Sequence, residues 1–204
     1  MVIDVAMIFP NTFPDASMWE GSRTRVLELA SGLLNIGFKV SVVCIKSSSY
    51  KYDIFDGIIL SYIGKALPIK LHYALFPITS LIRLPSLLRS LKPKIMHFHM
   101  STSALPKLFF PSLTNDAITI YDPHDLFFLK GEFFRRLNKV PSPIGHLCDV
   151  VDIQLLRKFD AIFVTTPLMR NFVRKYVRGK IYIIPNSVDT QLFSMAGRTM
   201  RHLF

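Results

Sequence analysis

The segment SRTRVLELASGLLNIGFKVSVVCI, residues 22–45, joins a helical pattern to a strand pattern. Apolar residues from Val26 to Leu34 recur at the spacing of one helix face, and Gly37 follows in the position where a left-handed residue commonly ends a helix. Residues 39–45 are apolar and largely β-branched, which is typical of a buried strand. The segment therefore predicts a helix that leads directly into a strand of a parallel sheet.

The rest of the chain repeats this alternation. We expect further strands at residues 2–9, 57–63, 94–98, 117–121, 161–165 and 180–184, with a loop at 10–19. We expect helices at residues 22–36, 71–91, 124–137, 144–158 and 167–176, the second of them broken near its prolines. This order predicts an α/β fold with a single Rossmann-like, doubly wound, mostly parallel sheet. Residues 1–193 would form that domain, and residues 194–204 a C-terminal tail.

The composition favours a folded domain with a basic surface. Half of the 204 residues are hydrophobic, and 25 Lys and Arg against 14 Asp and Glu give a net charge of +11. Such a charge attracts polyanions, including anionic lipid, phosphorylated substrates and nucleic acid. The sequence has no helix-turn-helix, zinc-finger or RNP spacing, so we rank nucleic acid last among these partners.

The cysteines and the apolar segments indicate the cellular compartment and the relation to membranes. Cys44 and Cys148 form no disulfide framework and lack metal-ligand spacing, which favours a reducing, cytoplasmic compartment. No segment is apolar over enough residues to cross a bilayer. The mixed basic and apolar segments 81–94 and 129–139 would permit peripheral contact with the inner face of a membrane, although ordinary helices with one solvated side have the same composition.

Candidate functional residues follow the predicted strands, because ligands of such sheets bind at the carboxyl ends of the strands. His124 and Asp125 follow the strand at 117–121, and Asn186 follows the last strand. Gly21 and Ser22 begin the first helix, whose free N–H groups could hold an anion.

A structural alternative exists for each of these candidates. Ser22 could be a simple N-cap, Asn186 a turn residue, and His124 or Asp125 part of an ordinary first helical turn. Both readings remain open at this point.

His97 and His99 alternate along a strand end and so point the same way. They could line a cleft or be packed in the core. No third metal ligand is close in sequence, so we expect no metal and no cofactor.

Several segments in order resemble the retaining glycosyltransferases of the GT-B fold, family 4 type. They are EGSRTRVLELASGLLNIGFKVSVVC (20–44), LKPKIMHFHM (91–100), TIYDPHDLFF (119–128), FDAIFVTTPLMRNFVRKY (159–176) and KIYIIPNSVDTQLF (180–193). The chain departs from the family pattern at Ser187, where the family has glycine, and at Gly21, which stands alone where the family has paired glycines.

The resemblance implies a function. Enzymes of this type have two Rossmann-like domains that face each other across a cleft, and the second domain binds the nucleotide diphosphate. The chain would be the N-terminal, acceptor-side domain, with residues 194–204 at the start of the missing second domain. His124 would contact the transferred sugar as the catalytic residue, while Gly21, Ser22, His99, Asp125 and Asn186 would bind substrate. The acceptor would be a glycan or a lipid-linked molecule.

Other functions compete with this hypothesis. The chain could be a non-catalytic remnant or a module that binds glycans or a membrane surface. If the donor half is a separate chain, the open side of the cleft would favour a homodimer or a heteromer. A dinucleotide oxidoreductase is disfavoured, because no G-x-G-x-x-G follows the first strand.

Overall fold

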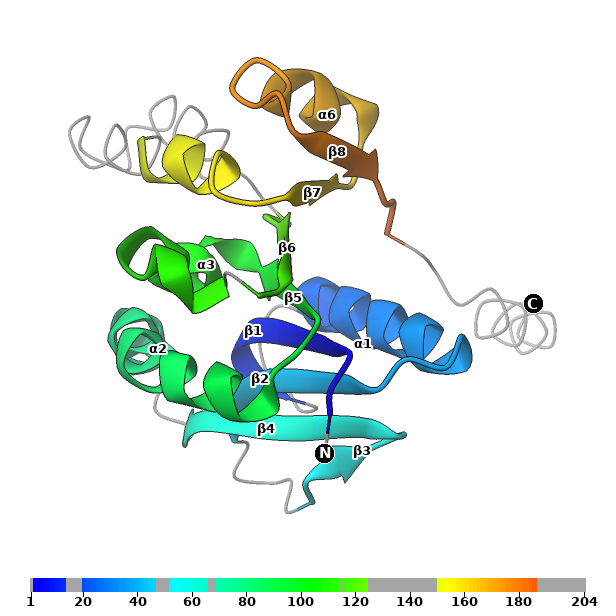
Figure 1. Cartoon of the computed structure of the whole chain (residues 1–204), viewed down its shortest axis with the longest axis vertical. Coiled ribbons are helices and arrows are strands. Elements are labelled where there is room, and N and C mark those ends of the chain that lie inside the picture. The colour runs from blue at the N-terminus through cyan, green and yellow to red at the C-terminus, as the bar shows by residue number, and fades with distance from the viewer. Residues whose placement is uncertain are drawn as a thin grey trace, which may run out of the picture.

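An eight-stranded sheet forms the centre of the molecule (Figure 1). The computed structural model describes residues 2–13, 20–46, 52–65, 69–114, 116–124 and 150–186. The strands are β1 (Val5–Phe13), β2 (Val40–Lys46), β3 (Ile54–Phe55), β4 (Ile58–Lys65), β5 (Ile95–His99), β6 (Ile118–Asp122), β7 (Ala161–Val164) and β8 (Lys180–Ile183). Their order is β3-β4-β2-β1-β5-β6-β7-β8, and every pairing is parallel except the short β3–β4 hairpin. The predicted α/β, mostly parallel sheet is therefore confirmed.

Helices cover both faces of this sheet. They are α1 (Glu20–Asn35), α2 (Ile69–Leu91), α3 (Met100–Phe109) and α6 (Pro167–Val173), with a 3-10 turn at Pro111–Thr114 and a helical segment at residues 150–156. In Figure 1, α2 and α3 lie on one side of the sheet and α1 lies on the other. This arrangement makes the sheet doubly wound, as the sequence predicts.

Two apolar clusters fill the layers between helices and sheet. On one face, Val26 and Ala30 of α1 pack with Met7, Val42 and other fully buried strand residues. On the other face, helical residues such as Leu84 and Leu88 of α2 and Leu155 of 150–156 pack against alternate residues of the same strands. Because both faces are covered, the central strands are apolar without interruption.

The C-terminus of α1 has the form that the sequence predicts. Gly37 adopts φ +92°, and its N–H donates to the carbonyl of Leu34 at 2.9 Å. The N–H of Phe38 donates to the carbonyl of Leu33 at 3.0 Å. This pair of bonds is a Schellman motif, and it aims the chain into β2.

Two sequence expectations are wrong in detail. The helix α2 is continuous from Ile69 to Leu91, because its buried face outweighs the backbone bonds lost at Pro77 and Pro85. The strand β1 continues through residues 10–13, with an irregular register between Ile8 and Thr12 that accommodates Pro10, which has no N–H to donate.

Helix α3 was not expected from the sequence, since its serines and Pro106 conceal the helical pattern. Other strand boundaries shift by one to three residues. Residues 125–137 of one predicted helix, residues 144–149 of the next and the proposed boundary at residue 193 lie outside the described residues.

Candidate functional site

The carboxyl ends of the strands meet the N-terminus of α1 around one hollow of about 350 Å³. Its lining residues come from segments that are far apart in sequence: Gly21, Ser22, Arg25, His124, Thr165, Met169 and Asn186. The strand order reverses at β1 and β5, next to these residues. Open α/β sheets bind their ligands at such a position.

Arg25 is a buried cation beside this hollow, with 4% of its side chain exposed. Its Nε donates to Oδ2 of Asp122 at 2.7 Å. Its Nη1 donates to the carbonyl oxygens of Ile184 at 2.9 Å and Pro185 at 3.3 Å, and to Oδ1 of Asn186 at 3.1 Å. One guanidinium group thus joins α1, the end of β6 and the segment after β8.

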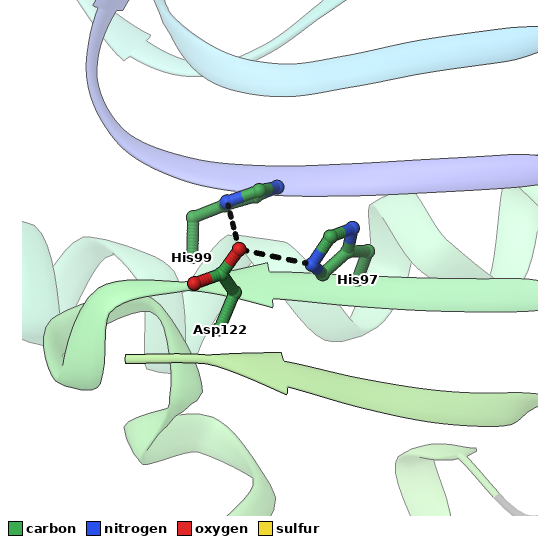
Figure 2. Close-up of side chains that lie close together, drawn as sticks. All are labelled: His97, His99 and Asp122. Atoms are coloured by element: carbon green, nitrogen blue, oxygen red, sulfur yellow. Dashed lines mark ion pairs between the residues drawn. The ribbon is translucent and has the colours of Figure 1, made fainter. Parts of the chain in front are cut away.

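Asp122 is the shared neighbour of three histidines. Figure 2 shows His97 and His99 projecting from β5 toward the carboxylate of Asp122 on the adjacent strand. Oδ2 of Asp122 lies 3.7 Å from Nε2 of His97 and 3.9 Å from Nδ1 of His99. Its Oδ1 lies 3.9 Å from Nε2 of His124. These contacts are longer than hydrogen bonds, so Arg25 is the closest partner of Asp122.

His124 is held by His99. The Nδ1 of His99 lies 2.9 Å from Nε2 of His124, and the two rings meet edge to face. Both chain segments pass through left-handed backbone at this point, with φ +68° at Met100 and φ +54° at His124. Such conformations are strained for residues other than glycine, and they turn the chain sharply where the histidines meet.

The electrostatic environment of the cluster determines the protonation states of Asp122 and His99. Burial acts to raise the pKa of Asp122, but the side chain of His97 and the charges of His124 and His99 together lower it well below its ordinary value. Burial lowers the pKa of His99 well below 6.5, and the charges of His97 and His124 lower it further. Near neutral pH, Asp122 is therefore ionised and His99 is neutral.

The same donors have the chemistry of a metal site. One potential ligand atom each from His97, His99 and Asp122 lies within 4.8 Å of the others. The guanidinium of Arg25 already bonds the carboxylate, so a divalent cation would meet a fixed positive charge. The expectation that this domain holds no metal stays a prediction.

The structure brings most of the predicted site residues together. Gly21, Ser22, His124 and Asn186 line the hollow. His99 does not line it; it is completely buried behind His124. Asp125 lies outside the described residues. The functional roles of these residues remain proposals.

Sequence reasoning gave little weight to Arg25 and Asp122, which organise the site. A signal for Arg25 does exist, because it falls four residues before Leu29 and eight before Leu33 on the inner face of the helix. A charge on an apolar helix face needs a buried partner. No sequence spacing identifies that partner as Asp122, which is 97 residues away.

A protein-family model matches most of the chain. Residues 19–192 match the model of Glycosyltransferase Family 4. The chain belongs to this family. A search of the curated proteins found no match for this Family 4 domain.

Solved structures share its fold at low sequence identity. Sucrose-phosphate synthase from Thermosynechococcus elongatus is 14% identical with a TM-score of 0.71, over 93% of this chain and 49% of the synthase. A second, shorter chain of that synthase is 15% identical with a TM-score of 0.63, over 98% of this chain and 99% of the other. The catalytic domain of Starch Synthase IV from Arabidopsis thaliana, bound to ADP and acarbose, is 14% identical with a TM-score of 0.58. The match covers 94% of this chain and 53% of the starch synthase chain.

The Family 4 domain therefore has the fold of a GT-B half. It spans about half the length of the longer synthase chain that it matches. Among its described residues, no helix combines the length and apolar character needed to cross a bilayer.

Proposed function

We propose that this chain is the acceptor-side domain of a retaining glycosyltransferase. The enzyme moves a sugar from a nucleotide-diphosphate donor to a glycan or a lipid-linked acceptor. The donor nucleotide is held mainly by a second domain outside these 204 residues, in the same polypeptide or in a partner chain. The observation that carries the proposal is the convergence of Gly21, Ser22, His124 and Asn186 on one hollow at the strand ends.

The polar groups around the hollow are mostly hydrogen-bond donors. Nη2 of Arg25 is buried and makes no hydrogen bond within the described part of the chain. Nη1 of Arg25 donates to Oδ1 of Asn186, so the remaining polar group of that amide is its NH₂ donor. Gly21 and Ser22 add the N-terminal end of α1, with its partial positive charge. This set fits an oxygen-rich or anionic substrate.

His124 is the group we propose to contact the transferred sugar. It lines the hollow while His99 holds its Nε2. An imidazole in this position can hydrogen-bond a sugar hydroxyl and orient the ring for transfer. The buried Asp122 carboxylate, 3.9 Å away, would stabilise positive charge that develops nearby.

We also propose peripheral contact with an anionic membrane surface through α2. Ile78 and Ile82 on this helix are 53% and 72% exposed, and Arg89 lies on the same helical face. The helix contains no acidic residue. An exposed apolar pair on the same helical face as a cation favours the interface of an anionic bilayer, where a lipid-linked acceptor would reside.

The experiment is a transfer assay with labelled nucleotide hexoses on the full chain combined with its donor-binding domain. His124→Ala is expected to lower the rate at least roughly 100-fold, the range of a positioned imidazole. Arg178→Ala, at an exposed position, is the control and should keep the wild-type rate. NMR of the product should show retention of the anomeric configuration of the donor. A fully active His124→Ala enzyme or an inverted product would overturn the proposal.

A further inference from the structure

The contact between His99 and His124 allows only one hydrogen between two nitrogens. Nδ1 of His99 and Nε2 of His124 are 2.9 Å apart, and a proton on both nitrogens would clash. One ring must therefore donate and the other must accept. The two rings meet edge to face at 86°, with centroids 5.1 Å apart.

His99 has a single ring proton to place. Its ring is completely buried, and burial with the charges of His97 and His124 keeps its pKa well below 6.5, so it is neutral. In one arrangement the proton lies on Nδ1 and is donated to His124. In the other the proton lies on Nε2, and His124 donates to His99 instead.

The free nitrogen of His99 distinguishes these arrangements. Its Nε2 is buried and has no hydrogen-bond partner within the described residues. A proton there would be a buried donor without an acceptor, which folded proteins strongly avoid. If Nε2 of His99 is instead unprotonated, the single N–H of the ring is on Nδ1, where it is hydrogen-bonded to His124. The carboxylate of Asp122 is 3.9 Å from both contacting nitrogens and so does not favour either arrangement.

We propose that His99 is a positioning residue that donates its Nδ1–H to Nε2 of His124 and thereby holds the His124 proton on Nδ1. The fixed groups around the pair are the Asp122 carboxylate, the Arg25 guanidinium bonded to it and the neighbouring His97 ring. The Asp122 carboxylate, fixed by Arg25, holds the His99 ring at the end of β5 beside β6, so its donor direction is set by the sheet.

The consequence for catalysis rests on the proposed function of His124. With Nε2 occupied as an acceptor, His124 can take up a proton there only if the His99 proton moves to Nε2, where it finds no acceptor. His124 therefore carries its ring hydrogen on Nδ1 and stays neutral, rather than acting as a general base through Nε2. This assigns to His99 the control of the tautomer, without contact with the substrate.

The test is ¹⁵N NMR of the histidine rings in the full chain, near pH 7 and without substrate. The signal of His124 is identified by its loss in His124→Gln. The expected wild-type spectrum shows protonated Nδ1 and unprotonated Nε2 for His124. Protonated Nε2 in the wild type would overturn the proposal.

Two substitutions separate tautomer control from a structural role. His99→Asn places an amide N–H where Nδ1–H was, and should keep the wild-type His124 spectrum. His99→Phe removes the donor and should shift His124 to the Nε2-protonated or a mixed form. His97→Phe is the matched control, since it removes a neighbouring imidazole but leaves the His99–His124 bond.

An unchanged His124 signal in a folded His99→Phe protein would refute the proposal. If that variant does not fold, the wild-type and His99→Asn spectra decide. Because no substrate is present, this result is independent of the transfer assay: an inactive domain can still show the expected tautomer.

Discussion

At the scale of single residues, Arg25 is the position on which the geometry of the hollow depends. A buried guanidinium is stable only when it is paired, and here its partners are a buried carboxylate, two carbonyl oxygens and an amide. The pairing also fixes Asn186 by its side-chain oxygen. The position of Asn186 at the hollow therefore depends on the same guanidinium that forms the buried ion pair with Asp122.

Replacing Arg25 should destabilise the fold and the hollow together. Arg25→Ala leaves Asp122 buried and ionised without its closest partner, so we expect a loss of about 3–5 kcal/mol in the free energy of unfolding. Urea denaturation followed by circular dichroism measures this loss. Arg178→Ala removes an exposed arginine and should change stability by less than about 0.5 kcal/mol. Equal effects of the two variants would contradict the ion-pair account.

Acid should destabilise the protein through His99 before it acts on Asp122. The folded-state pKa of His99 is lowered, whereas in the unfolded chain it is about 6.5. As pH falls from 7 to 5, the unfolded state binds a proton that the folded state does not, so the free energy of unfolding falls. Asp122, whose folded pKa is also lowered, adds a further loss below about pH 5.

The measurement is urea denaturation at several pH values between 5 and 7. His99→Asn should flatten the pH dependence, whatever its effect on absolute stability at pH 7. An identical slope for the variant and the wild type would show that other groups cause the acid sensitivity.

At the scale of elements, α1 connects the sequence pattern most directly to the site. Its apolar face packs on the sheet, its N-terminus faces the hollow and its C-terminus turns into β2. The sequence predicts all of this local structure, because helix periodicity and a C′ glycine are short-range signals. By contrast, α3 and the continuity of α2 depend on packing against distant residues and were not predicted.

Two glycines, one inside α1 and one just after its C-terminus, should respond in opposite ways to alanine. Gly37 has φ +92°, so Gly37→Ala should lower the free energy of unfolding by about 1 kcal/mol. Gly32 lies inside the helix with nothing within 4 Å of an added Cβ, so Gly32→Ala should raise it by up to about 1 kcal/mol. Thermal denaturation of both variants tests this pair. Changes of the same sign would be inconsistent with the capping role of Gly37.

The exposed face of α2 should determine membrane contact. Ile82→Glu replaces an exposed apolar residue by an anion and should reduce co-sedimentation with phosphatidylserine-containing vesicles several-fold. Leu168→Glu, at a 77% exposed position on α6, is the control and should bind like the wild type. Vesicles of phosphatidylcholine alone should bind neither protein. Equal losses in the two variants would indicate a non-specific charge effect rather than a contact at α2.

At the scale of the whole molecule, the proposed function requires this sheet to supply one wall of a cleft whose other wall is the donor-binding domain. The chain matches about half of the longer synthase chain, and the hollow lies at the strand ends. A nucleotide sugar that touches one wall gains only part of its contacts. The affinity of this chain alone should therefore be low.

Calorimetry of the isolated chain with nucleotide hexoses checks this expectation. We expect a Kd weaker than about 1 mM, which corresponds to a binding free energy near −4 kcal/mol. The chain combined with its donor-binding domain should bind far more tightly. Micromolar binding by the chain alone would locate the donor site within these 204 residues and contradict the division of the cleft.

The sequence by itself determined the class of fold and the candidate residues at the strand ends. Continuous apolar strands, a periodic helix face and a C′ glycine are local patterns, and each follows from the chemistry of a few neighbouring residues. The rule that ligands bind at the carboxyl ends of parallel strands then points to His124 and Asn186 from the sequence alone.

Only the tertiary structure decided how those residues are connected. Arg25 and Asp122 are 97 residues apart, and their pairing depends on the strand order that places β6 beside β5 and opposite the start of α1. The same packing removed His99 from the surface and placed it behind His124. Burial and long-range ion pairing arise from contacts between distant segments, so no short-range pattern in the chain specifies them.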